Sequence, residues 1–257
     1  MSLMAQERYR VIVEHVARHG RARLVELQSR LGISSASLRR DVTELETRGQ
    51  VVRVHGGVMH PAHVSEPSLA MRQRQARPAK AAIAEAAAAL VQPGQTAFID
   101  AGSTCLLVGR RLAARRDVTL ITHSLSFAAA AVGGEASILV IGGRVRSISG
   151  ALVGAEAIGV LDRLSADWAF LGASGLSAEG VSTPELEESA IKQAFLRRAR
   201  WAVVCADAGK WDHPAAVRFA RWKEIDQWVV DAEANKPAVR AVRRQGVEVR
   251  IVSRRSR

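Results

Sequence analysis

Between residues 79 and 252 the sequence alternates short apolar runs with segments of helical period. Each run spans five or six residues, which is typical of a strand buried on both faces of a sheet. The predicted strands are residues 96–100, 118–122, 137–141, 167–171, 201–206, 227–231 and 247–252. Because helical segments separate most of these runs, consecutive strands are expected to run in the same direction. The alternation therefore predicts an α/β domain with a mainly parallel sheet.

Small polar and cationic residues follow the predicted strands, at the edge where ligands bind in sheets of this kind. These residues are Asp100, Gly102, Ser103 and Thr104 after the first strand, Thr122, His123 and Ser124 after the second, Gly142, Gly143 and Arg144 after the third, Gly175 after the fourth, and Asp207 and Lys210 after the fifth. Backbone amides, hydroxyl groups and cations that meet at one edge can bind an anion. Taken singly, each residue has an ordinary structural explanation: a glycine can form a turn, Arg144 can be a surface charge and Asp207 can cap a helix. Their repetition after successive strands favours one shared anion site.

The first sixty residues follow a different pattern, with three short amphipathic helices. The first helix ends near Gly20 and the second at Gly32, because glycine is favoured where a helix stops. Ser34 is a good N-cap, so a third helix is expected to begin there after a tight turn. Beyond Gly49 the period becomes that of a strand, and the pair Gly56-Gly57 marks the turn of a small β-hairpin. Three helices followed by such a wing form the winged helix-turn-helix arrangement, an α+β domain.

The exposed side of the third predicted helix suits the major groove of DNA. An apolar stripe must be buried, which leaves small, polar and cationic side chains on the opposite side. Small residues allow a close approach, hydroxyl groups bond phosphate or base edges, and arginine binds guanine or phosphate. The pair Arg39-Arg40 alone would be a solvated helix face, but the winged arrangement around it favours DNA. The predicted DNA-binding residues are Ser35, Ala36, Ser37, Arg39, Arg40 and Thr43 on the helix, with Arg53 and His55 on the wing.

The net charge of +12 over 257 residues implies an anionic partner. Because the excess is spread along the chain, charge alone does not separate nucleic acid from a phosphorylated small molecule. Cys105 and Cys205 stand far apart without metal-ligand spacing, so we expect no metal site and no disulfide framework, which fits a reducing cytoplasm. No apolar run approaches the roughly 18 residues of a membrane span, so no membrane partner is expected.

The segment from residue 24 to 57 ends in LRRDVTELETRGQVVRVHGG and resembles the N-terminal domain of DeoR-type bacterial transcription regulators. The positions that match the pattern of that family are Ser34, Arg39, Arg40, Asp41, Leu45, Glu46, Gly49, Arg53, His55, Gly56 and Gly57. Ser37 stands where threonine is usual and keeps the hydroxyl group, and Val42 stands where leucine is usual. The resemblance implies sequence-specific binding to double-stranded operator DNA.

The rest of the chain resembles the C-terminal sensor domain of the same family, which is similar in fold to ribose-5-phosphate isomerase. The matching positions are Lys80, Asp100, Gly102, Ser103, Thr104, Thr122, Ser124, Gly142, Gly143, Gly175, Glu188, Lys192, Asp207 and Lys210. His123 replaces the asparagine of a Thr-Asn-Ser motif, and Trp211 stands where phenylalanine is common. The resemblance implies a phosphorylated sugar or polyol as the effector, and it adds Glu188 and Lys192 to the predicted effector site. We expect no cofactor.

We predict a winged helix-turn-helix domain at residues 4–60, a linker at residues 61–77 and a sensor domain at residues 78–253. The predicted linker holds Pro61 and Pro67 and has little apolar periodicity, with a helical turn expected near residues 69–74. Helix-turn-helix proteins read paired half-sites. Together with the family resemblance, this predicts a homo-oligomer, either a dimer or a larger assembly.

Two functions fit these features. The first is a cytoplasmic DNA-binding repressor of a sugar or polyol operon, which a sugar phosphate releases from its operator. The second is a sugar-phosphate isomerase with an appended DNA-binding domain, which would need a base for a carbon-bound proton. The isomerases resembled here carry an acidic cluster after the fourth strand. This chain has Gly172-Ala173-Ser174-Gly175 there, without a carboxylate, which favours the repressor and predicts no catalytic residue.

Overall fold

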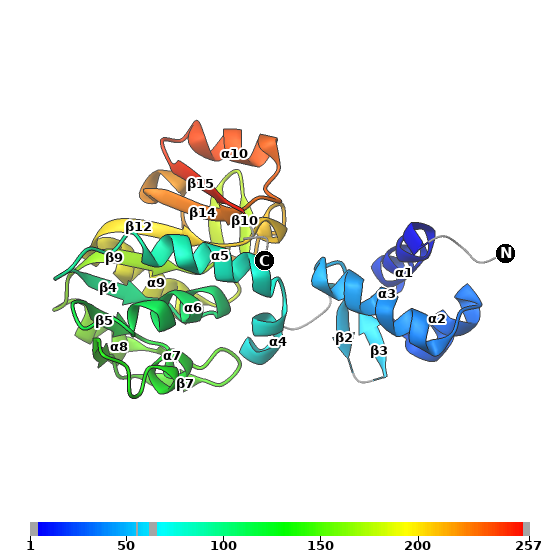
Figure 1. The fold of residues 1–257 in the computed structure, drawn as a ribbon, viewed down its shortest axis with the longest axis horizontal. Helices are drawn as coiled ribbons and strands as arrows, with labels where there is room; N and C mark the ends of the chain where they lie inside the picture. Colours follow the sequence, from blue (N-terminus) through cyan, green and yellow to red (C-terminus); the bar gives the residue numbers. More distant parts are fainter. Residues whose placement is uncertain (1–4, 55, 62–65, 254–257) are drawn as a thin grey trace. The chain divides into compact units, whose positions relative to one another are not determined.

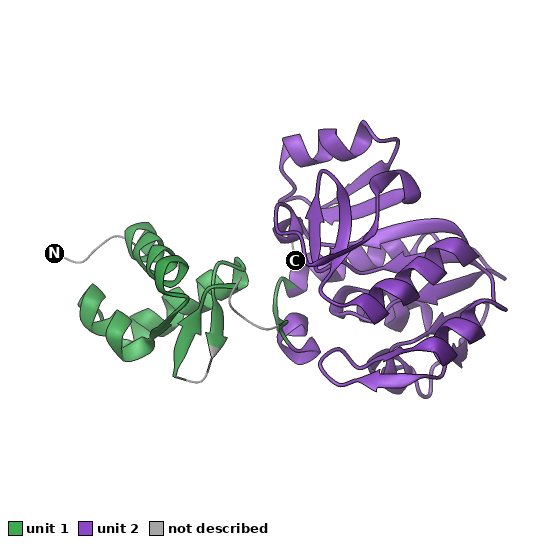
Figure 2. Ribbon diagram, turned by 180° about the vertical axis from the view of Figure 1, so that it is seen from behind, with its two compact units in different colours: residues 1–67, 74–76 green, residues 68–73, 77–257 purple. Residues whose placement is uncertain are grey.

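The computed structural model describes residues 5–54, 56–61 and 66–253 of the chain. The chain divides into two compact units (Figure 2). Unit 1 comprises residues 1–67 and 74–76, and unit 2 comprises residues 68–73 and 77–257. The segment predicted as a linker contains the short helix α4 (Leu69–Arg74), where the sequence predicts a helical turn. The assignment of the chain therefore changes from unit 1 to unit 2 around α4.

Unit 1 contains the predicted helices and wing (Figure 1). Its elements are α1 (Ala5–His19), β1 (Arg21–Arg23), α2 (Leu24–Leu31), α3 (Ser35–Thr47), β2 (Val52–Val54) and β3 (Gly57–Met59). The strands pair antiparallel in the order β1-β3-β2. The sequence does not predict β1, because three residues with one buried side chain give no periodic signal. Gly57 permits this third strand, since a Cβ at that position would lie 2.5 Å from the carbonyl oxygen of Ala22.

The apolar stripe of α3 packs into the core of unit 1, as the sequence predicts. Leu38, Val42 and Leu45 are at most 1% exposed and share one apolar cluster with side chains of α1 and α2. Ser34 caps the helix, because its Oγ accepts a hydrogen bond from the amide of Ser37 at 3.2 Å. This packing determines which side of α3 remains outside the core.

Unit 2 contains a sheet of seven parallel strands in the order β15-β14-β12-β9-β4-β5-β6. The strands are β4 (Thr96–Ile99), β5 (Thr119–Thr122), β6 (Ser137–Val140), β9 (Ala166–Leu171), β12 (Ala199–Cys205), β14 (Gln227–Asp231) and β15 (Glu248–Val252). Each overlaps one predicted strand, so the predicted α/β class and parallel sheet are confirmed. The strand order places β12, β9 and β4 side by side in the middle of the sheet, where their carboxyl ends meet.

Helices cover both faces of this sheet (Figure 1). On one face lie α5 (Arg77–Ala88), α6 (Ser103–Leu112) and α7 (Leu125–Ala130), and on the other α8 (Ala155–Leu161), α9 (Leu186–Arg198) and α10 (Lys236–Arg243). Neighbouring residues of a strand therefore point into different cores: Phe98 packs with α9, and Ile99 packs with α5 and α6. None of the described helices has both the length and the apolar character needed to cross a membrane.

Several short elements surround the large sheet of unit 2. They are the hairpin of β7 (Arg144–Arg146) and β8 (Ala151–Val153), the antiparallel sheet of β10 (Gly175–Ser177), β11 (Gly180–Thr183) and β13 (Val217–Ala220), and the 3₁₀ turns η2 (Ala208–Lys210) and η3 (Trp222–Glu224). The sequence does not predict these strands. Each has only three or four residues, which is too few for periodicity to identify a strand.

Candidate functional site

Asp41 of α3 is buried and faces the interior of unit 1. Arg8 of α1 donates to both carboxylate oxygens, from Nε at 2.7 Å and from Nη2 at 3.0 Å. A bidentate pair between two largely buried side chains fixes the orientation of α3 against α1. Asp41, which matches the DeoR-type pattern, therefore positions the helix.

The opposite side of α3 carries the residues predicted to contact DNA. The exposed ones are Ser35, Ala36, Arg39, Arg40 and Thr43, while Ser37 is half-buried. Within the described residues, the guanidinium groups of Arg39 and Arg40 make no hydrogen bond or ion pair with the protein. Two such cations beside small side chains are suited to phosphate or to a base edge. Their contact with DNA stays a prediction.

Arg53 of the wing is bonded to α3. Its Nη2 donates to the carbonyl oxygen of Arg39 at 3.1 Å and to Oγ1 of Thr43 at 3.0 Å. The amide of Arg53 donates to Oε1 of Glu46 at 3.2 Å. These bonds join β2 to α3, so Arg53 has a structural role that the sequence does not predict. His55, the other wing residue predicted to contact DNA, lies outside the described residues.

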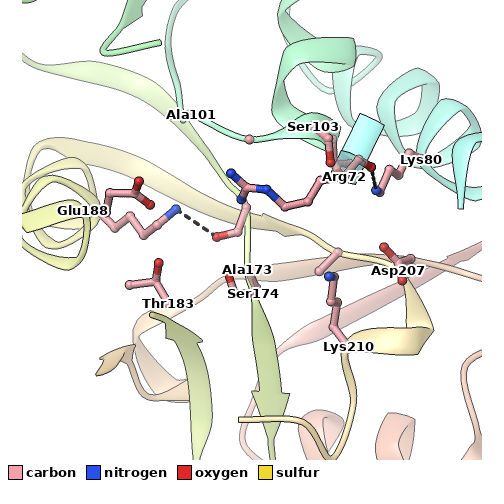
Figure 3. Close-up of a pocket in the computed structure, with 15 residues that line it drawn as sticks. Arg72, Lys80, Ala101, Ser103, Ala173, Ser174, Thr183, Glu188, Asp207 and Lys210 are labelled. Carbon is pink, nitrogen blue, oxygen red and sulfur yellow. Dashed lines mark hydrogen bonds between the residues drawn. The ribbon is translucent and has the colours of Figure 1, made fainter. Parts of the chain in front are cut away.

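In unit 2 a pocket lies where the carboxyl ends of β4, β9 and β12 meet (Figure 3). The empty space at this site, counted together with the open solvent at its mouth, is about 470 Å³. The lining residues are Arg72, Lys80, Ala101, Gly102, Ser103, Thr104, Gly172, Ala173, Ser174, Thr183, Glu188, Lys192, Ala206, Asp207 and Lys210. Cations, hydroxyl groups and carboxylates thus share one small cavity. Such a lining suits a polar ligand with a negative charge.

A buried ion pair joins the strands at this edge. Lys192 of α9 donates to Oδ2 of Asp100, which follows β4, and to the carbonyl oxygen of Gly172 at 3.1 Å. The same Asp100 oxygen accepts the amide of Gly172 at 2.7 Å. Burial alone would raise the pKa of Asp100, but Lys192 and His123 outweigh burial and lower this pKa to about 2. The Asp100 carboxylate is therefore ionised at neutral pH and connects β4, β9 and α9.

The residues predicted after β5 are buried and do not line the pocket. His123 is fully buried, and its Nε2 lies 2.9 Å from Oδ1 of Asp100 and 2.9 Å from the amide nitrogen of Ala101. Thr122 and Ser124 are at most 1% exposed. His123 and Thr122 bond to the end of β4 and the segment that follows it, whereas Ser124 caps α7.

Ser103 and Thr104 form the start of α6 and belong to the pocket lining. The amides in the first turn of a helix have no acceptor within the helix, and they carry the positive end of the helix dipole. Gly102 is the N-cap and has a φ of 155°, which residues with a side chain rarely adopt. The turn that brings these amides to the pocket therefore depends on glycine.

Lys80 of α5 contributes a buried ammonium group. It is 3% exposed, and its Nζ donates to the carbonyl oxygen of Arg72 at 2.5 Å. Burial lowers the pKa of Lys80 to about 8; Asp207 opposes this shift, whereas Lys210 and Arg72 add to it. An anion bound beside Lys80 would relieve the repulsion among these cations and raise the pKa of Lys80 again.

Glu188 of α9 is held by the β7–β8 hairpin. Its Oε1 accepts from Oγ of Ser149 at 2.5 Å and from Nη1 of Arg146 at 3.0 Å. The Glu188 carboxylate therefore has a fixed position in the pocket lining. Among the described residues, no group of three or more histidine, cysteine, aspartate or glutamate side chains is placed to hold a metal ion.

The structure brings part of the predicted effector site together. The predicted residues that line the pocket are Gly102, Ser103, Thr104, Glu188, Lys192, Asp207 and Lys210. Those that do not line it are Asp100, Thr122, His123, Ser124, Gly142, Gly143, Arg144 and Gly175. Arg144 is exposed and pairs with Glu187. Gly175 is required by packing, because a Cβ there would lie 2.0 Å from the carbonyl oxygen of His213. Binding of an effector by any of these residues stays a prediction.

Four polar residues of the lining are absent from the predicted effector site, namely Arg72, Lys80, Ser174 and Thr183. The sequence does indicate Lys80, because Lys80 matches the DeoR-type pattern. The sequence does not indicate Arg72, because the segment predicted as a linker has no periodicity from which the direction of a side chain could be inferred. Thr183 ends β11, a strand that the sequence does not predict.

Two sequence families match successive parts of the chain. The DeoR-like helix-turn-helix domain matches residues 8–63. The DeoR C terminal sensor domain matches residues 75–232. Among solved structures, ribose 5-phosphate isomerase A of Methanocaldococcus jannaschii aligns with 51% of this chain and 53% of its own, at 22% sequence identity and a TM-score of 0.38.

Similar proteins match over nearly their whole length. The HTH-type transcriptional regulator YgbI of Escherichia coli strain K12 is 34% identical, covering 95% of this chain and 96% of its own. For the HTH-type transcriptional regulator GlpR of Haloferax volcanii the identity is 32%, with 96% and 98% covered. For the HTH-type transcriptional regulator FruR of Bacillus subtilis it is 30%, with 90% and 93% covered. With both domains matched in order, this chain belongs to the DeoR family of helix-turn-helix transcriptional regulators.

Proposed function

We propose that this regulator represses a sugar or polyol operon, and that a phosphorylated sugar or polyol in the pocket of unit 2 releases it from its operator. The observation that carries the proposal is the lining, where Ser103 and Thr104 at the start of α6 accompany Lys80 and Lys210. Helix N-terminal amides and ammonium groups commonly bind phosphate in proteins. They supply the phosphate half of the proposed site.

Carboxylates in the same lining supply the other half. Glu188 and Asp207 can accept hydrogen bonds from hydroxyl groups. These carboxylates would repel a phosphate placed beside them, so the ligand should present hydroxyl groups there and its phosphate elsewhere. A phosphorylated sugar or polyol has this distribution of groups. Such a ligand fits the lining better than inorganic phosphate or an unphosphorylated sugar.

For the DNA partner, we propose that α3 enters the major groove of double-stranded operator DNA. Support comes from the exposed side of α3, where Arg39 and Arg40 stand beside the small side chain of Ala36. Arginine can bind guanine through two hydrogen bonds, and a small neighbour lets the helix approach the bases. Because helix-turn-helix proteins bind paired half-sites, we propose a homo-oligomer on the operator.

An isomerase with an appended DNA-binding domain has less support. The relatives described above are named as transcriptional regulators. Isomerisation needs a base that accepts a carbon-bound proton near the working pH. With its pKa lowered to about 2 by Lys192 and His123 against the effect of burial, Asp100 is too weak a base for that step. Glu188 is engaged by the hairpin hydrogen bonds described above.

The test compares phosphorylated compounds with their unphosphorylated counterparts. The full-length protein is titrated by calorimetry with a panel of short sugar and polyol phosphates, the same compounds without phosphate, and inorganic phosphate. Operator binding is then measured by fluorescence anisotropy with each compound present. We expect at least one phosphorylated compound to bind and to weaken operator binding, while its counterpart does neither. The proposal is wrong if no phosphorylated compound binds, or if the counterpart acts equally well.

A further inference from the structure

Arg72 lines the pocket although it belongs to α4, in the segment predicted as a linker. The other lining residues all lie between residues 80 and 210. Figure 3 shows the Arg72 side chain extending across the pocket toward the side where Glu188 lies. A cationic side chain from α4, which precedes the first strand of the large sheet, thus reaches the space available to a ligand.

Backbone hydrogen bonds attach α4 to unit 2 beside the same pocket. The amide of Leu69 donates to the carbonyl oxygen of Ile148 at 3.0 Å, in the β7–β8 hairpin that also holds Glu188. The carbonyl oxygen of Arg72 accepts from Nζ of Lys80 at 2.5 Å. Both attachments therefore lead to lining residues, to Lys80 directly and to Glu188 through the hairpin. The position of α4 and the geometry of the pocket depend on each other.

The charges around Arg72 favour an anion. After burial, the charges of Lys210 and Arg72 are what lower the pKa of Lys80, while Asp207 opposes them. Three cations are therefore close enough to repel one another at this side of the pocket. A bound anion would remove that repulsion. A guanidinium group can in addition hold two phosphate oxygens at once, which an ammonium group does not do.

We propose that Arg72 binds the anionic group of the effector, so that the segment joining the two units is itself part of the effector site. This inference rests on the proposed function, and it adds both a ligand-binding residue and a route of regulation. Residues 68–73 belong to unit 2, while the residues on both sides of them belong to unit 1. An effector held by Arg72 changes how firmly α4 is attached to unit 2. It acts on the chain where the two units are joined.

The test is the affinity of full-length Arg72→Met protein for the phosphorylated compound that binds the wild type most tightly. Loss of a charge-assisted bidentate contact should raise the dissociation constant by about tenfold to a hundredfold. Arg74→Met is the matched control, because Arg74 is exposed on the same helix and does not line the pocket. It should bind within about twofold of the wild type. Arg72→Lys keeps the charge without the planar group, and its affinity should fall between the two.

Unchanged or tighter binding by Arg72→Met protein would contradict the inference, and so would an equal loss in both methionine variants. Thermal unfolding of the ligand-free proteins checks the fold. If Arg72→Met protein does not fold, Arg72→Lys decides: binding weakened about threefold or more supports the inference, and wild-type affinity contradicts it. If the wild type binds no phosphorylated compound, the proposed function itself fails. Wild-type binding with an unaffected Arg72→Met protein removes this inference alone.

Discussion

Lys192 and Asp100 form an ion pair in which the two side chains are 3% and 0% exposed. A buried pair of this kind adds little net stability, but removing one partner leaves the other charge buried and uncompensated. Lys210 lines the same pocket and is half-buried. The pocket therefore contains one lysine that the fold requires and another that is more accessible to a ligand.

The first prediction compares these two lysines. Lys192→Met should lower the free energy of unfolding by about 3 kcal/mol or more, because it leaves the Asp100 carboxylate buried without its ammonium partner. Lys210→Met should change it by less than about 1 kcal/mol, although it should weaken binding of the proposed ligand. Urea unfolding at pH 7 measures both. Equal stabilities of the two variants would contradict the structural role of Lys192.

The same comparison has a pH dependence. Lys192 and His123 overcome burial and lower the pKa of Asp100 from 3.8 to about 2, so the ionised carboxylate stabilises the folded state at pH values above about 4. This stabilisation is lost as the pH falls from about 4 toward 2. The difference in stability between the wild type and Lys192→Met protein should therefore shrink across that window. A difference that stays constant from pH 7 to pH 2 would exclude the ionised pair as its cause.

Arg40→Ala tests the proposed contact between α3 and DNA. If Arg40 reads a base, its loss should weaken operator binding by about 1 to 3 kcal/mol and affect a scrambled duplex much less. Fluorescence anisotropy with both duplexes over a series of salt concentrations measures the effect. Equal losses on the two duplexes would make Arg40 a phosphate contact.

Arg53→Ala tests whether the wing arginine supports α3 or touches DNA. Because Arg53 bonds the Arg39 carbonyl oxygen and Thr43, its loss should lower the free energy of unfolding of unit 1 by about 1 kcal/mol. Operator and scrambled duplex should both bind more weakly, with the salt dependence of binding unchanged. Removing a phosphate contact would instead reduce the salt slope by about one. That result would show that Arg53 leaves α3 to bind DNA.

The lowered pKa of Lys80 predicts how the affinity for a ligand depends on pH. Burial, with Lys210 and Arg72, lowers the pKa of Lys80 to about 8, so the free pocket loses this charge as the pH rises through that value. A phosphate ligand is already doubly ionised there, since its second pKa is near 6. Affinity should therefore fall above pH 8, by up to about tenfold per pH unit. Calorimetry from pH 7 to 9.5 should show this fall in the wild type and its absence in Lys80→Met protein, and equal slopes would contradict it.

The large sheet could be predicted because its strands are apolar runs buried on both faces. In β14 all five residues are buried, which leaves a signal that no amphipathic helix would give. β10 has three residues and β1 has three, and the pairing of β1 depends on a partner distant in sequence, since Arg21 pairs with Met59. Short strands of this kind are determined by tertiary contacts and not by local pattern.

The strand edge could be predicted as a site, but not the direction of each side chain at that edge. Ser103 and Lys210 line the pocket, whereas Arg144 turns outward to Glu187 and Gly175 packs against backbone. Loop conformation decides between these outcomes, and long-range contacts set it. Arg72 is the extreme case, because its helix is held in place by hydrogen bonds to Lys80 and to Ile148, and Ile148 is far from α4 in sequence.

The central claim is that one phosphorylated ligand and the operator bind this protein with opposing preferences. A ligand can release DNA only if it binds the conformation of low DNA affinity more tightly, with a coupling of about 1 to 3 kcal/mol that must be reciprocal. The Ser103→Ala/Thr104→Ala protein serves as the control, since it should bind operator normally and lose the response. The decisive measurement is the affinity for operator with and without ligand, together with the affinity for ligand with and without operator. Equal and opposite factors in the wild type, absent from the control, are predicted; operator binding that ligand leaves unchanged would contradict the account.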